Sequence, residues 1–100
     1  MPKSPENCET MEDVRAGVDH VDRELMTLLA RRFGYMEAAA RIKLDREAVR
    51  DEPRKVQVIS AAMKDAREHG LPETVIGQMW EALVEGSIAF EFARWDDISR

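Results

Sequence analysis

Apolar residues recur every three or four positions between Met11 and Lys43, which is the spacing of one face of an α-helix. In order, this face carries Met11, Val14, Val18, Val21, Leu25, Leu28, Arg32, Met36, Ala39 and Lys43. Thr10 is suited to cap the first turn, and the acidic Glu12 and Asp13 favour the positive end of the helix dipole. The pattern therefore predicts one helix of about 33 residues, roughly 50 Å long.

Two shorter amphipathic stretches follow a break in the pattern at residues 44–50. Asp51 can cap the first of them, with Pro53 in its first turn, and Gly70 can end it in a left-handed conformation. The second begins around Pro72, and Phe90, Phe92 and Trp95 make its C-terminal end bulky. Their apolar faces are Val56, Ile59, Met63 and Ala66, then Ile76, Met79, Trp80, Leu83, Val84 and Ser87. No stretch alternates with the period of a strand, so the sequence predicts an all-α fold of three helices.

The length of the first helix raises the question of what covers its apolar face. A domain of this size has a radius of gyration near 13 Å, whereas the helix would span about 50 Å. Part of its face therefore needs a partner chain, and a homodimer is expected. Residues 1–9 contain two prolines and mostly polar residues. They predict a flexible N-terminal arm, followed by one helical domain over residues 10–100.

Composition narrows the classes of function. The net charge of −5 does not suit binding to nucleic acid or to an anionic membrane. The single Cys8 excludes an intramolecular disulfide and, with two histidines, makes a poor set of metal ligands. No apolar run approaches the roughly 20 residues of a membrane span, and the N-terminus lacks the apolar core of a signal peptide. We therefore expect a cytoplasmic protein.

Arg32 and Lys43 are the two charged residues within the apolar face of the first helix. Burial of a charge is costly unless an opposite charge meets it, which leaves two interpretations. In one, Arg32 pairs with Asp22 or Glu91, and Lys43 extends to solvent at the helix end. In the other, both residues hold a small polyanion. Ser87 lies one turn before Glu91 on the third helix, and no nucleophile–base pattern is present.

A longer pattern connects these residues. It reads R-x₁₆-R-x₁₀-K at Arg15, Arg32 and Lys43, then VRDxxR at residues 49–54, then S-x₃-E at Ser87 and Glu91. In order and spacing it resembles the all-helical chorismate mutases and the related isochorismate-pyruvate lyases, over roughly residues 10 to 95. The N-terminal PENC, followed by VRAGVDHVD, is similar to the lyase branch in particular.

The resemblance implies an intertwined homodimer with two active sites, each built from both chains, and a reaction without cofactor or covalent intermediate. The substrate would be a small dicarboxylate, chorismate or isochorismate. The residues implied to bind it are Arg15 from the other chain, Arg32, Asp51, Arg54 and Ser87. Lys43 and Glu91 would be the catalytic residues, on either side of the ether oxygen. No metal, nucleic acid or membrane is implied.

Chorismate mutase is the first functional interpretation. In its Claisen rearrangement the carbon–oxygen bond breaks ahead of full carbon–carbon bonding, so negative charge grows on the ether oxygen. Fixed donors aimed at that oxygen stabilise the transition state more than the ground state. The first alternative is a lyase that forms salicylate and pyruvate from isochorismate. The second is a non-catalytic helical dimer that binds a metabolite or a partner.

Two residues depart from the usual family pattern. Glutamine is common where Glu91 stands, and only a protonated glutamate can donate a hydrogen bond to the ether oxygen. We therefore predict activity that falls as the pH rises. Lys55 stands where many chorismate mutases carry a glutamate that binds the ring hydroxyl, and a lysine cannot accept that hydrogen bond. The sequence thus leaves open whether chorismate or isochorismate is the substrate.

Overall fold

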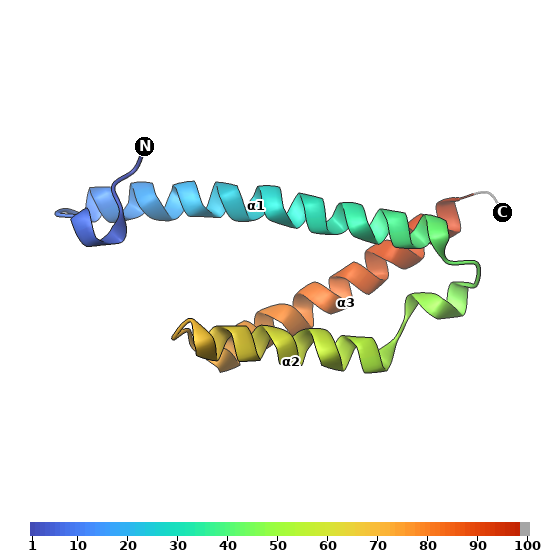
Figure 1. Ribbon diagram of the computed structural model, residues 1–100. Coiled ribbons are helices and arrows are strands. Elements are labelled where there is room, and N and C mark those ends of the chain that lie inside the picture. Colours follow the sequence, from blue (N-terminus) through green and yellow to red (C-terminus); the bar gives the residue numbers. More distant parts are fainter. Residues whose placement is uncertain (99–100) are drawn as a thin grey trace. The chain divides into compact units, whose positions relative to one another are not determined.

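The computed structural model describes residues 1–98, and over that range it is built of helices alone (Figure 1). In chain order these are the 3₁₀ turn η1 (Pro5–Asn7), α1 (Met11–Ile42), the 3₁₀ turn η2 (Arg46–Val49), α2 (Glu52–Glu68) and α3 (Glu73–Asp97). The prediction of an all-α chain with three helices, the first very long, is confirmed.

The start of α1 is fixed by three hydrogen bonds, two of which are reciprocal between Thr10 and Asp13. Thr10 Oγ1 accepts from the amide of Asp13 at 3.1 Å. Asp13 Oδ2 in turn accepts from the amides of Glu9 and Thr10 at 3.0 and 3.3 Å. This arrangement is a capping box with aspartate as its acidic member, and it satisfies amides that the helix leaves without partners. The predicted cap at Thr10 is confirmed, and α1 ends one residue before the predicted Lys43.

The segment predicted as a loop, residues 44–50, contains the short turn η2. Asp45 Oδ1 caps it by accepting from the amide of Glu47 at 3.1 Å. Val49, at the end of the turn, is only 4% exposed, and η2 packs against α3. The sequence contained two residues that favour this turn, the capping Asp45 and the apolar Val49. Because η2 has only four residues, about one helical turn, no repeat of apolar positions revealed it.

Both ends of α2 follow the prediction. Asp51 Oδ1 accepts from the amide of Arg54 at 3.0 Å and so caps the first turn. At the other end Gly70 has φ of 68°, the left-handed conformation that favours glycine. Its amide donates to the carbonyl of Arg67 at 3.2 Å, and the amide of Leu71 donates to that of Ala66 at 2.8 Å. These two bonds form a Schellman motif, which ends the helix sharply.

The buried hydrophobic side chains of α2 and α3 are small. Ala62 and Ala66 of α2 and Val84 of α3 are 7%, 2% and 7% exposed. At Gly77 of α3, an added Cβ would lie 3.0 Å from Met63 Sδ, so the two helices approach closely at that point. The core of this part of the chain is thin, and it positions α3 directly beside α2.

The chain divides into two compact units, residues 1–34 and the residues from Tyr35 onward. In the first unit the N-terminal arm lies along the start of α1. Lys3 Nζ is 3.3 Å from Asp13 Oδ2, and its carbonyl oxygen is 3.9 Å from an added Cβ at Gly17. The proposal of a flexible arm over residues 1–9 stays a prediction.

The apolar face of α1 in the first unit is largely uncovered in the single chain. Val18, Val21, Leu25 and Leu28 are 53%, 53%, 49% and 56% exposed. Within residues 1–98, none of the helices combines the length and apolar character needed to cross a membrane. An apolar stripe of this kind on a helix that is otherwise polar is typical of an interface between helices.

Candidate active site

Lys43 and Glu91 form a partly buried ion pair in the second unit. Lys43 directly follows α1, and its amide donates to the carbonyl of Ala39 at 2.9 Å. Its Nζ lies 2.7 Å from Glu91 Oε2. Glu91 is only 4% exposed, whereas the side chain of Lys43 is 29% exposed. The lysine therefore meets the charge of a carboxylate that is held out of water.

Ser87 lies one turn before Glu91 on α3 and is 3% exposed. Its hydroxyl donates to the carbonyl of Leu83 at 2.7 Å, a bond within the same helix. A serine hydroxyl can exchange such a bond for one to a ligand by rotating about χ1, because the Leu83 carbonyl is also the acceptor of a backbone bond. Ser87 and Glu91 thus line one buried face of α3.

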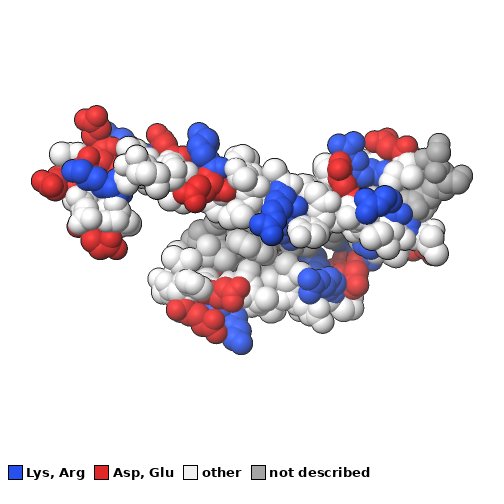
Figure 2. All heavy atoms as spheres, turned by 45° about the horizontal axis from the view of Figure 1, so that its top comes forward, with Lys and Arg blue, Asp and Glu red and all other residues white. Residues whose placement is uncertain are grey.

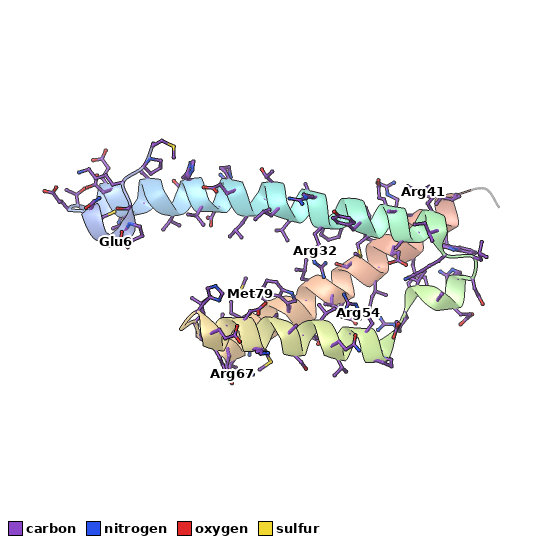
Figure 3. All side chains as sticks on the ribbon, viewed as in Figure 1. Glu6, Arg32, Arg41, Arg54, Arg67 and Met79 are labelled. Atoms are coloured by element: carbon purple, nitrogen blue, oxygen red, sulfur yellow. The ribbon has the colours of Figure 1, made fainter. Side chains whose placement is uncertain are left out.

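Arg54 lies in the first turn of α2 (Figure 3), and Asp51 is the residue that caps this helix. The guanidinium of Arg54 is exposed, and its contact with Gln57 Oε1 is long, at 3.5 Å. Its planar group of donors suits a carboxylate. The carboxylate of Asp51 instead caps the helix through the Arg54 amide. In this structure Asp51 acts on the backbone that carries Arg54, and its direct contact with substrate stays a prediction.

Arg15 and Arg32 belong to the first unit, both on α1. Arg15 is exposed, and Arg32 is half-buried within the apolar face (Figure 3). The structure thus brings Lys43, Ser87 and Glu91 to one region of the second unit. The participation of Arg15 and Arg32 in a site with these residues stays a prediction from the resemblance.

A network of ion pairs between α2 and α3 was not predicted. Lys55 Nζ lies 2.7 Å from Glu81 Oε1 and 2.8 Å from Glu85 Oε2. Arg50 also reaches Glu85, with a shortest distance of 2.9 Å, and it contacts Glu52 at 2.8 Å. Hydrogen bonds from Arg50 and then Lys55 lower the pKa of Glu85 to about 2. Lys55 is therefore held by carboxylates of α3, a pairing that no helical spacing within the sequence could reveal.

Figure 2 shows acidic and basic side chains interspersed over the face in view. Among residues 1–98, no three His, Cys, Asp or Glu side chains are grouped so that they could hold a metal ion. Lys43 and Arg54, both in the second unit, are cationic donors of the kind that bind a small anionic molecule.

The Chorismate mutase type II family model matches residues 14–92, and the chain belongs to this family. The resemblance inferred from the sequence is thereby confirmed, and the matched range contains all of the expected site residues. Over 93 residues the chain is also 27% identical to the isochorismate pyruvate lyase of Pseudomonas aeruginosa. That match covers 93% of this chain and 92% of the relative. The family is one of enzymes that bind a chorismate-type substrate.

Proposed function

We propose that the protein is a chorismate mutase, which rearranges chorismate to prephenate without cofactor or covalent intermediate. The observation that carries this proposal is the contact of 2.7 Å between Lys43 and the buried Glu91, in a chain of the Chorismate mutase type II family. In this contact Lys43 donates and Glu91 accepts, and once Glu91 carries a proton both side chains can donate to one substrate oxygen atom. Such a pair is what the rearrangement requires.

The cationic residues account for substrate binding in this proposal. Arg32 and Arg54 of one chain and Arg15 of the other hold the two carboxylates, because the guanidinium fork matches a carboxylate with two hydrogen bonds. Ser87 adds a hydroxyl donor. With both carboxylates held, the enolpyruvyl side chain lies over the ring, and a rare conformer in solution becomes the bound one.

Lys43 and Glu91 account for the acceleration of the chemical step. As the ether bond lengthens, negative charge grows on its oxygen, and the ammonium of Lys43 donates to it. Glu91 can donate from the other side only when it is protonated, and an ionised Glu91 repels the developing charge. The reactive form of the complex is therefore the one that carries a proton on Glu91.

The homodimer of this proposal is supported by the spacing along α1. From Met11 to Leu28 the apolar positions alternate steps of three and four, as in the a and d positions of a coiled coil. Val18 and Leu25 occupy two of these positions, and both are about half exposed in the single chain. Arg15 then falls at an e position, at the edge of the row of a and d positions, from which a side chain reaches a neighbouring helix.

The second candidate is an isochorismate-pyruvate lyase, which the relative from Pseudomonas aeruginosa favours. Its reaction is also pericyclic and breaks the same ether bond, so the same cationic residues and the same donors serve it. The products are salicylate and pyruvate. A third interpretation is a helical dimer that binds a metabolite or partner without catalysis. It predicts that Lys43→Ala preserves function, whereas substitutions in the apolar face of α1 abolish it.

One experiment separates these functions. Purified protein is incubated with chorismate and, separately, with isochorismate, and prephenate, salicylate and pyruvate are measured. Prephenate from chorismate with little salicylate supports the mutase. Salicylate and pyruvate from isochorismate support the lyase, and absence of turnover with both substrates overturns both enzyme proposals in favour of the binding dimer.

A further inference from the structure

One turn after Glu91, α3 contacts Lys43 a second time. The indole Nε1 of the half-buried Trp95 donates to the carbonyl oxygen of Lys43 at 3.2 Å. Glu91 and Trp95 are four residues apart and so share one face of the helix. Glu91 holds the side chain of Lys43, and Trp95 holds its backbone.

The next residue of α3 holds the segment that follows Lys43. Arg46 Nε and Nη2 donate to the two carboxylate oxygens of Asp96 at 2.8 and 3.0 Å. The guanidinium of Arg46 also lies over the ring of Phe92, 4.5 Å from its centroid. A bidentate pair fixes orientation as well as distance. The last turns of α3 therefore contact both ends of the segment 43–46, Lys43 through Trp95 and Arg46 through Asp96.

This attachment matters because Lys43 lies just beyond the last residue of α1, Ile42. Carbonyl groups at the end of a helix have no amide of the same helix to accept from, and such ends open readily. The lysine side chain adds four rotatable bonds between the backbone and the ammonium. A defined place for the ammonium thus requires a defined place for the Lys43 backbone.

We propose that Trp95 is a positioning residue for Lys43. Its indole N–H fixes the carbonyl of Lys43 and thereby the point from which the ammonium reaches the reacting oxygen. This inference rests on the proposed function, because that function makes Lys43 a catalytic residue. Trp95 itself contacts the lysine backbone and acts through it.

The test is Trp95→Phe, which retains an aromatic ring and removes the N–H. The matched control is Trp80→Phe, the same change on the same helix roughly four turns earlier. For Trp95→Phe we expect kcat to fall about tenfold with KM within about twofold, since misplacement by about 1 Å can cost roughly 100-fold. Trp80→Phe should retain both constants. Rates are compared under conditions where circular dichroism shows each variant fully folded.

A second readout does not depend on turnover. Hydrogen–deuterium exchange of residues 43–49 in the absence of substrate should be faster in Trp95→Phe than in the parent or in Trp80→Phe. If Trp95→Phe does not fold, Asp96→Asn is used in its place. Asp96 is exposed, and its substitution weakens the ion pair with Arg46 at the other end of the same segment. For that variant we expect a fall in kcat of about threefold.

The outcomes separate this inference from the proposed function. No turnover of chorismate or isochorismate by the parent protein overturns the proposed function, and with it the positioning role. Turnover by the parent together with an unchanged kcat in Trp95→Phe overturns the positioning role alone. A rise in KM with kcat retained also overturns it, since that result places Trp95 in substrate binding.

Discussion

The ammonium of Lys43 lies 2.7 Å from Glu91 Oε2, and this contact joins the residue after α1 to α3, 48 positions later in the chain. In this arrangement the buried carboxylate is the acceptor and the lysine is the donor. For both groups to donate to one substrate oxygen, as the proposed mechanism requires, Glu91 must first gain a proton. The rate of the proposed reaction therefore depends on the protonation of Glu91.

The first prediction concerns the pH dependence of activity. We expect kcat/KM of the parent to fall as the pH rises, because the ionised Glu91 repels the developing oxyanion. Glu91→Gln donates its amide N–H at every pH, so its profile should vary by no more than about twofold from pH 5 to 8.5. Initial rates across that range are the measurement. A profile for Glu91→Gln that follows the parent's would contradict the role given to the proton.

The second prediction concerns Arg54. We expect Arg54→Ala to lower kcat/KM by roughly 100-fold, since charge-assisted hydrogen bonds to a carboxylate contribute on the order of 3 kcal/mol. The matched control is Arg67→Ala, at the other end of α2, where the arginine pairs with Glu73 at 3.0 Å on the surface. Steady-state rates and circular dichroism are measured for both variants. Equal, small losses would remove Arg54 from the binding site.

The third prediction tests whether each site uses both chains. Arg15→Ala and Lys43→Ala should each be nearly inactive alone. A mixed dimer of the two variants contains one site with both residues intact if Arg15 comes from the partner chain. Random reassociation should then restore about a quarter of parental activity. If Arg15 instead serves its own chain, mixing restores nothing, and the parent mixed with itself controls for losses during reassociation.

The fourth prediction concerns stability in acid. Glu85 has a pKa of about 2 in the folded protein, below its ordinary value of 4.5. A group with a depressed pKa stabilises the fold above its ordinary value, and that contribution is lost as the pH falls toward the folded value. Because the Glu85 side chain is 40% exposed and its ion pairs are partly screened by solvent, Glu85→Gln should lower Tm only slightly at neutral pH, and this difference should shrink between pH 4.5 and about 2.

The control for Glu85 is Glu73→Gln, since Glu73 pairs only with the exposed Arg67 among the ion pairs that the structure records for it. Surface pairs of this kind contribute little to stability. Its Tm should match that of the parent at each pH. A difference for Glu85→Gln that is constant from neutral pH to pH 2 would show that its ion pairs do not produce the effect.

Local signals in the sequence were sufficient to predict the start of α1 and both ends of α2. The caps at Thr10 and Asp51 and the left-handed Gly70 each act within a few residues, so pattern and position agree. The family, too, followed from the order and spacing of charged residues. These features could be predicted because each depends on neighbours along the chain.

The contacts that were missed depend on how separate helices meet. The pairing of Lys55 with Glu81 and Glu85 requires α2 and α3 to lie side by side at one particular register. The hydrogen bond from Trp95 to Lys43 joins residues 52 positions apart. A tryptophan near the end of a helix has many structural uses, and its sequence neighbours do not indicate which of them applies. Its hydrogen-bond partner, Lys43, can be identified only once α3 is packed against the end of α1.

The uncovered valines and leucines of α1 have a consequence for how activity is measured. In the proposed dimer these side chains leave water only when two chains associate, so association and the completeness of each site follow the law of mass action. Specific activity per chain should then decline when the enzyme is diluted below its dimer dissociation constant. A rate assay run over a dilution series would thus report the strength of subunit association.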